Sequence, residues 1–157
     1  MTFLLTPIFA ALLAAGPTEA KSARITSRSS DFDRQAGVVM FEGDVVVRYS
    51  AGYTMCADRL YMFLSSSNEL SRVVAVGAVS ITNETRVGTC ARAVYRRKRG
   101  EVEMFGDGKD AKARLVERGD KAGELEGTRI RFWLDSEQVE VEGARIGVPQ
   151  KGMEVLQ

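Results

Sequence analysis

The stretch Val39-Met40-Phe41-Glu42-Gly43-Asp44-Val45 places apolar side chains at every second position and carries a glycine in the middle of the pattern. A period of two is typical of a β-strand with one buried face. Glycine is unfavourable inside a strand, so Gly43 indicates either a β-bulge or a plain turn glycine. Both interpretations predict a bend in the chain at this point.

Three later segments share this pattern: Val73-Val74-Ala75-Val76-Gly77-Ala78-Val79, Val102-Glu103-Met104-Phe105-Gly106-Asp107-Gly108 and Val139-Glu140-Val141-Glu142-Gly143-Ala144-Arg145. A second element recurs between them, as Ala57-Asp58-Arg59-Leu60-Tyr61, Ala91-Arg92-Ala93-Val94-Tyr95 and Gly127-Thr128-Arg129-Ile130-Arg131-Phe132. Two elements that recur in step predict an all-β protein of stacked short-strand repeats. In the third repeat, Gly108 and Asp110 replace apolar residues, so we expect that rung to pack poorly.

The alternation assigns the side chains to faces. The first element is predicted to point inward through Val39, Phe41, Val45, Val47, Val73, Ala75, Val79, Ile81, Val102, Met104, Val139 and Val141. The second element is expected to form the facing wall, through Leu60, Met62, Val94, Ile130, Phe132 and Leu134. A solvated outer surface is expected at Glu42, Arg48, Arg59, Glu101, Glu103, Arg129, Glu140 and Glu142.

Composition narrows the function classes. The 157 residues are enough for one domain, and 22 Lys and Arg against 21 Asp and Glu give no field that attracts nucleic acid. The chain has no histidine, which removes Ser/His and Cys/His catalytic pairs and His-bearing metal sites. We therefore predict a non-enzymatic protein with no catalytic residues, no metal, no cofactor and no nucleic-acid partner.

The first twenty residues have the character of a secretory signal peptide. An apolar run from Phe3 to Ala15 is followed by Gly16 and Pro17, and its length is that of a signal-peptide core. It is shorter than the ~20 residues that span a bilayer. Cleavage is predicted after Ala20, although an uncleaved anchor or a buried strand would also fit the run. The predicted division is a signal peptide at 1–20, one β-domain at 21–147 and a C-terminal tail at 148–157.

The ordered series of motifs resembles the OstA-like domain of the LptA/OstA-like family. The residues that carry the resemblance are Phe41-Glu42-Gly43-Asp44-Val45, Ala57-Asp58-Arg59-Leu60, Val73 through Ile81, and Tyr95 followed by Val102-Glu103-Met104-Phe105-Gly106. The resemblance extends from about Ile25 to Ile146. It implies an antiparallel, semi-closed β-jellyroll, shaped like a folded taco, in a periplasmic lipopolysaccharide-transport protein.

In that family the apolar interior receives lipid A acyl chains, and members stack end to end between the inner and outer membranes. The resemblance implies as partners lipopolysaccharide, transport proteins of both membranes and further copies of the chain. The groove residues would be Val39, Phe41, Val45, Val47, Leu60, Met62, Val79, Ile81, Val94, Met104, Ile130, Phe132 and Val141. A self-assembling structural β-solenoid without a lipid ligand is the alternative that the repeats leave open.

Two smaller features have two interpretations each. Cys56 and Cys90 occupy corresponding repeat positions. If equivalent strands are direct neighbours the two can form a disulfide, whereas an intervening strand leaves two free thiols. The basic cluster Arg96-Arg97-Lys98-Arg99 indicates either a contact with lipid phosphates or a solvated hairpin turn.

Overall fold

The computed structural model describes residues 2–3, 23–50, 52–119, 122–134, 136 and 138–147. Within these residues the chain forms one antiparallel sheet of thirteen strands and a 3-10 turn, η1 (Arg97–Arg99). This confirms the predicted all-β, antiparallel fold. The strands are β1 (Thr2–Phe3), β2 (Ala23–Thr26), β3 (Ser29–Asp33), β4 (Val38–Tyr49), β5 (Thr54–Leu64), β6 (Leu70–Thr82), β7 (Arg86–Arg96), β8 (Glu101–Phe105), β9 (Ala113–Glu117), β10 (Gly123–Gly127), β11 (Arg129–Trp133), β12 (Val139–Glu142) and β13 (Arg145–Gly147).

The predicted signal peptide at 1–20 lies outside the described residues except for β1, whose backbone pairs with Ile25 and Thr26 of β2. The predicted tail at 148–157 also lies outside them. In the described part of the chain, no helix has the length and apolar character needed to span a membrane.

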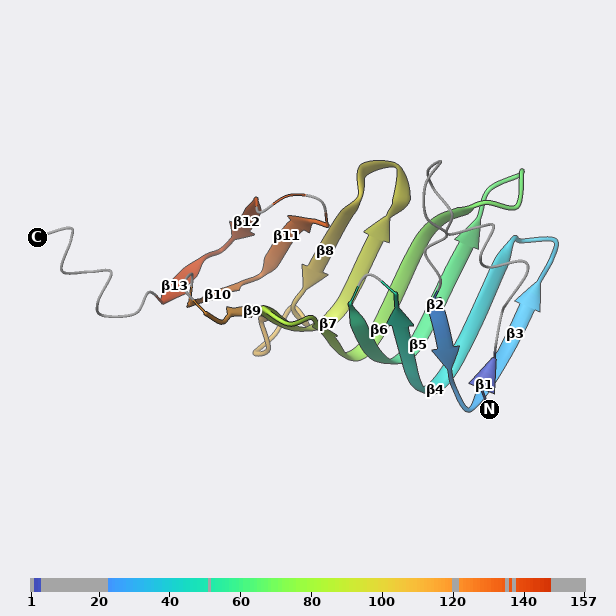
Figure 1. Cartoon of the computed structure of the whole chain (residues 1–157), viewed down its shortest axis with the longest axis horizontal. Helices are drawn as coiled ribbons and strands as arrows, with labels where there is room; N and C mark the ends of the chain where they lie inside the picture. Colours follow the sequence, from blue (N-terminus) through green and yellow to red (C-terminus); the bar gives the residue numbers. More distant parts are fainter. Residues whose placement is uncertain are drawn as a thin grey trace, which may run out of the picture.

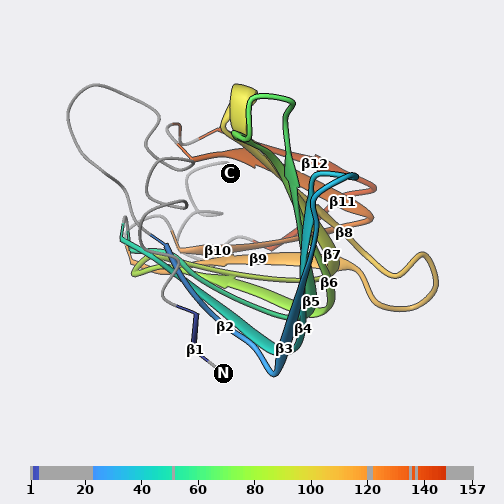
Figure 2. The same ribbon diagram turned by 90° about the vertical axis from the view of Figure 1, so that its right-hand side faces the viewer.

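The sheet is folded lengthwise into two walls that meet along one line, which we call the crease (Figure 2). The first wall runs in the order β1–β2–β4–β5–β6–β7–β9–β10–β13, and the second in the order β3–β4–β5–β6–β7–β8–β11–β12. The long strands β4 to β7 cross the crease and belong to both walls, while the strands after β7 each belong to one wall (Figure 1). The result is the semi-closed V that the resemblance implies.

The crease is made by β-bulges at the repeated glycines. The register of β4 against β5 shifts between Glu42 and Val45, and that of β6 against β7 shifts between Val76 and Val79. Gly43 and Gly77 both have φ of +84°, and the residues that follow, Asp44 and Ala78, have φ of +46° and +45°. Two successive left-handed residues turn the strand sharply. The bulge interpretation of these two glycines is therefore confirmed.

The third repeat crosses the crease by a different route. β8 ends at Phe105, the chain leaves the sheet over 106–112, and β9 re-enters it at Ala113 in the first wall. Ala113 and Leu115 are fully buried and fill the space opposite Met104. The prediction of a poorly packed rung is wrong, because the loop moves the apolar residues of this repeat several positions along the chain.

The core lies between the walls as two clusters that share Ile81, Cys90 and Tyr95 at their boundary. The predicted inward-pointing residues lie in or against these clusters, apart from Val94. One detail of the prediction is wrong: the two repeated elements do not form separate walls. Phe41 and Leu60 are cross-strand neighbours in the second wall, because each long strand contributes to both walls.

The outer face of the second wall contains buried charge rather than the solvated surface predicted there. Glu101 and Glu103 on β8 are only 3% and 4% exposed, beneath arginines from β7 and β11. Arg96 forms ion pairs with both carboxylates, and Arg129 Nε donates to Glu103 at 2.5 Å. Arg131 adds contacts of 3.7 Å to Glu101 and 3.6 Å to Glu103. Pairing of this density lets two carboxylates remain buried.

The two carboxylates differ in their proton affinity. Burial, followed by the hydrogen bond and the negative charge of Glu103, raises the pKa of Glu101 against the opposing effects of Arg96 and Arg99. Burial also acts to raise the pKa of Glu103, but hydrogen bonds with Glu101 and Arg129 and the charges of Arg129 and Arg96 outweigh it, so that pKa is lowered. Glu103 therefore holds the negative charge that the arginines stabilise.

Substitution by alanine should destabilise the protein more at a crease glycine than at an exposed glycine that has a similar positive φ. A Cβ at Gly77 would lie 2.9 Å from Cβ and Cγ of Asp58, whereas a Cβ at Gly52, with φ of +96°, meets no atom within 4 Å. We expect Gly52→Ala to cost about 1 kcal/mol of unfolding free energy and Gly77→Ala about 2–3 kcal/mol. Urea denaturation of both variants checks this, and equal losses would contradict the close packing at the crease.

Replacing each buried glutamate by glutamine should change the stability of the protein by different amounts. Since the pKa of Glu103 is lowered, its stabilisation is present at neutral pH and is lost as pH falls below the ordinary glutamate range. Ionising Glu101, whose pKa is raised, costs stability, and that cost is relieved as pH falls. We expect Glu103→Gln to lose about 2 kcal/mol at pH 7 and Glu101→Gln to lose little or nothing. Denaturation at pH 7 and at pH 4 tests the pair, and equal losses at pH 7 would refute the assignment.

Candidate functional site

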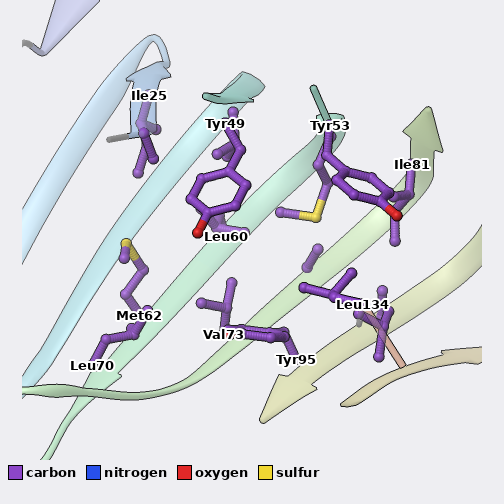
Figure 3. A pocket seen from close by; sticks show the side chains of 16 residues that line it. Ile25, Tyr49, Tyr53, Leu60, Met62, Leu70, Val73, Ile81, Tyr95 and Leu134 are labelled. Carbon is purple, nitrogen blue, oxygen red and sulfur yellow. The ribbon is translucent and has the colours of Figure 1, made fainter. Parts of the chain in front are cut away.

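A cavity of about 140 Å³, partly open to solvent, lies between the two walls (Figure 3). It is comparable in size to a cavity that holds one benzene ring. Both walls contribute to it, and apolar side chains dominate its surface. The lining residues are Ala23, Ile25, Val47, Tyr49, Tyr53, Met55, Leu60, Met62, Leu70, Val73, Ala75, Ile81, Ala93, Tyr95, Val102 and Leu134.

Three tyrosines provide the polar groups of this lining. Tyr49 ends β4 in the first wall, and Tyr95 lies near the end of β7 in the second. Burial raises the pKa of Tyr49. Burial and then the neighbouring Tyr49 raise the pKa of Tyr95, against an opposing effect of Arg97. Both rings line the same cavity (Figure 3), and their hydroxyls remain neutral and able to form hydrogen bonds at physiological pH.

The chemistry of this site is that of a surface for hydrocarbon. The described residues of its carbon-rich lining offer no ionised group to a ligand, and the tyrosines offer only neutral hydroxyls. Among the described residues, no group of three or more Cys, Asp or Glu side chains is placed to hold a metal ion. The arrangement can remove apolar surface from water, which is a binding function.

Comparison with known proteins identifies the family. The family model described as "LptA/(LptD N-terminal domain) LPS transport protein" matches residues 24–138, which is most of the chain. The chain belongs to this LptA/LptD N-terminal domain family. A search of curated proteins finds no significant match in sequence.

Nineteen chains from solved structures are significantly similar in structure to this chain. One is LptH from Pseudomonas aeruginosa, described as the LptA-homologous periplasmic component of the lipopolysaccharide-transport device. It is similar with a TM-score of 0.68 at 14% sequence identity, over 81% of this chain and 94% of that one. At this identity the match shows a shared fold.

The predicted groove residues fall into two groups: some line the cavity, and the others are packed below it or beyond it. Val47, Leu60, Met62 and Ile81 line the cavity. The others lie deeper or beyond it: Phe41, Val45 and Val79 are 1% exposed in the first cluster, Met104, Ile130 and Phe132 at most 2% exposed in the second, and Val39 and Val141 pack at the margins. The deep residues are closely packed and do not line the cavity.

Val94 is the residue that the prediction placed on the wrong face. It pairs with Val74 and Glu103, while its neighbours Ala93 and Tyr95 line the cavity. The prediction aligned the second elements 34 residues apart, which put Val94 in the place of Leu60. In the structure Ala75 pairs with both Leu60 and Ala93, so the true counterparts are 33 residues apart. The same spacing of 33 holds on the other side of the crease, where Ser80 pairs with both Cys56 and Thr89, so the slip comes from aligning the sequence on the similar motifs at Ala57 and Ala91.

The same slip of one residue explains why Cys56 and Cys90 point to different faces of the sheet. Strand β6 lies between them, because Cys56 pairs with Ser80 and Cys90 pairs with Val79. Cys90 packs into the core between the walls, whereas Cys56 alternates with the inward-facing Met55 and Ala57 and points outward. Both thiols are free, so the disulfide interpretation is wrong and the intervening-strand interpretation is confirmed.

Sequence reasoning missed the aromatic part of the lining. Tyr49 continues the inward face of Val45 and Val47, so extending the alternation by one step would have found it. Tyr95 was hidden by the slip that selected Val94. The basic cluster forms η1, where Arg97 donates to the Leu70 carbonyl at 3.5 Å and Gly100 closes the turn in a left-handed conformation. The cluster therefore forms a turn between β7 and β8, as one of its two interpretations predicts, and a contact with lipid phosphates stays a prediction.

The thiols should differ in reactivity. Burial raises the pKa of Cys90 to about 12, against hydrogen bonds with the backbone of Phe105 and Arg92 that lower it. The reactive thiolate is therefore scarce at neutral pH. We expect maleimide to modify Cys56 in the native protein and to reach Cys90 only after unfolding, as followed by intact mass in Cys56→Ser and Cys90→Ser variants. Rapid native labelling of Cys56→Ser would contradict the buried position of Cys90.

Proposed function

We propose that this protein carries lipopolysaccharide across the periplasm, with acyl chains held between its two walls and no chemical step. The observation that carries the proposal is the apolar cavity between the walls, which is partly open to solvent. Membership in the LptA/LptD N-terminal domain family supports the same assignment. The predicted export signal at 1–20 is consistent with a periplasmic location.

Burial of hydrocarbon supplies the affinity in this proposal. Each methylene removed from water contributes ~0.8 kcal/mol, so five methylenes contribute roughly 4 kcal/mol. Met62 and Leu60 of the second wall and Ile81 of the first wall would form part of this contact. Because each methylene contributes a small and equal amount to the binding energy, an acyl chain can slide through the site without breaking any single strong interaction. This suits a carrier.

The cavity accommodates a short length of one acyl chain in the state described. Its volume of about 140 Å³ is far below what several chains require. Cargo with several chains would therefore have to separate the walls against the resistance of β4 to β7, which cross the crease. Lipid binding and widening of the V would be one event.

The two ends of the sheet complete the proposed function. Edge strands offer unpaired N–H and C=O groups, which pair with the edges of neighbouring proteins. We propose that the protein docks end to end in this way and so lies within a bridge between the inner and outer membranes. Whether a neighbour can be a second copy of the chain depends on the charges at these edges.

The competing function is a structural β-solenoid that polymerises without a ligand. Its interior would be closed by its own side chains over the whole length. The cluster of Met104, Leu115, Ile130 and Phe132 fits that description, but the region between β2 and β7 does not, because the cavity lies there. The carrier is therefore the better-supported function.

A crosslinker in the cavity should capture lipid, and one on the adjacent outward residue should not. Met62 lines the cavity, whereas its neighbour Tyr61 points to the outer face of the same strand. With benzoylphenylalanine at each position and irradiation in cells, we expect a lipopolysaccharide adduct at Met62 at least tenfold above that at Tyr61, as detected by immunoblotting.

The base of the groove gives a second comparison. Phe41 is 1% exposed, so a crosslinker there should react with protein groups alone unless the walls part fully. Equal capture of lipopolysaccharide at Met62 and Tyr61 would overturn the carrier function. Absence of capture at both, in protein shown to be folded by circular dichroism, would favour the structural solenoid.

A further inference from the structure

The second wall has an unpaired edge at each end of the molecule. β3 pairs only with β4, and β12 pairs only with β11, within the part of the chain that the structure describes. These strands lie at opposite ends of the long axis (Figure 1). Each presents a row of backbone groups that a further strand can extend.

The edge strand β3 carries acidic side chains on its outward face. Asp31 and Asp33 pair with Met40 and Val38, which alternate with the inward-facing Val39 and Phe41. Phe32 lies on the groove side of this alternation and is 46% exposed. Among the described residues neither aspartate has an ion-pair partner, although Asp33 accepts a hydrogen bond from the Ala36 N–H at 3.0 Å. Two uncompensated negative charges therefore border this edge.

The edge strand β12 has the same pattern. Val139 and Val141 pack against the core, and Glu140 and Glu142 point outward. Their side chains are 52% and 70% exposed. Arg131 and Arg129 contact them at 3.5 Å and 3.4 Å from the inner side, but Arg131 also contacts the buried Glu101 and Glu103, and Arg129 also binds Glu103. The outermost charges at this end are negative as well.

A head-to-tail pair of copies would bring these two acidic rows together. Strands alternate in direction along the wall, so β12 of one copy would meet β3 of the next in antiparallel orientation. Any register that keeps Phe32 and Val141 on the groove side also puts Asp31 and Asp33 on the side of Glu140 and Glu142. Like charges opposite each other on neighbouring strands destabilise the pairing.

The first wall repeats the mismatch with the opposite sign. Arg24 on β2 and Arg145 on β13 are both exposed and point outward. Arg24 also lies directly across from Arg48 of β4. A head-to-tail copy would bring these two exposed arginines to the same junction, where β1 already occupies the positions beside Ile25 and Thr26.

We propose that the second-wall edges of this protein select a different protein over a second copy, namely one whose docking strand alternates Lys or Arg on its outward face with apolar residues on its groove face. This inference rests on the end-to-end docking in the proposed function and names its partner class. It replaces the expectation of self-association drawn from open strand edges alone. The apolar side of each edge supplies attraction to any such strand, and the charges decide which strand is accepted.

Reversing the charge of one edge converts the chain into its own partner. In Asp31→Lys/Asp33→Lys, a basic β3 edge would face the acidic β12 edge of the next copy. The matched control, Glu84→Lys/Asp110→Lys, makes the same charge change at exposed loop residues. In sedimentation velocity at low ionic strength, we expect the edge variant to associate at a concentration roughly tenfold below that of the wild type and the control. Adding salt should weaken this association.

Two further samples complete the test. Asp31→Lys alone, which disturbs no hydrogen bond of the turn after β3, should shift association in the same direction. Asp31→Lys/Asp33→Lys/Glu140→Lys/Glu142→Lys restores like charges, now positive, and should return to the wild-type level. If the wild type associates as readily as the edge variant, charge does not select the partner. If no sample associates at any concentration, the edges do not dock, and the bridging half of the proposed function fails independently of lipid capture at Met62.

Discussion

The left-handed residue pairs at the crease are the constraint on which the structure depends. Gly43–Asp44 and Gly77–Ala78 place two consecutive residues in a conformation that a strand interior otherwise avoids. Each pair adds a residue to its strand without one on the partner, and this sends the strand into the other wall. Without these bulges β4 to β7 would form one flat layer, and the core between the walls would not exist.

Charge on the outer face supports the same architecture by a different route. Arginines from β7 and β11 converge on Glu103 of β8, so the ion pairs tie the β7–β8 hairpin to a strand that lies further along the chain. A buried ion pair contributes little net free energy, because desolvation offsets the attraction. Its value lies in register, since moving β11 by one residue relative to β8 would turn Arg129 and Arg131 away from both carboxylates.

The sequence was sufficient for the fold class, the repeats and most of the inward face, because period-two alternation reports directly on burial. It was insufficient for the exact register between repeats, because the similar motifs that begin at Ala57 and Ala91 are not structural counterparts in the sheet. The one-residue slip between Leu60 and Ala93 misplaced Val94 and made Cys56 and Cys90 look equivalent. The buried state of Glu101 and Glu103 also could not be predicted, because it depends on arginines that the topology brings from separate strands. Depth within the groove, which separates Phe41 from Met62, is likewise a property of the folded sheet.

The unequal construction of the two halves has a mechanical consequence. β4 to β7 cross the crease as unbroken strands, whereas the later strands of the two walls are linked through 106–112, Thr128 and Gly143–Ala144. An unbroken strand opposes a change in the angle between its arms, because its hydrogen-bonded neighbours must flex with it. Arms joined through a short link can change their angle more freely. We therefore expect the N-terminal half to resist a change in the angle between the walls more than the C-terminal half, so a load applied at one end would not be transmitted unchanged to the other.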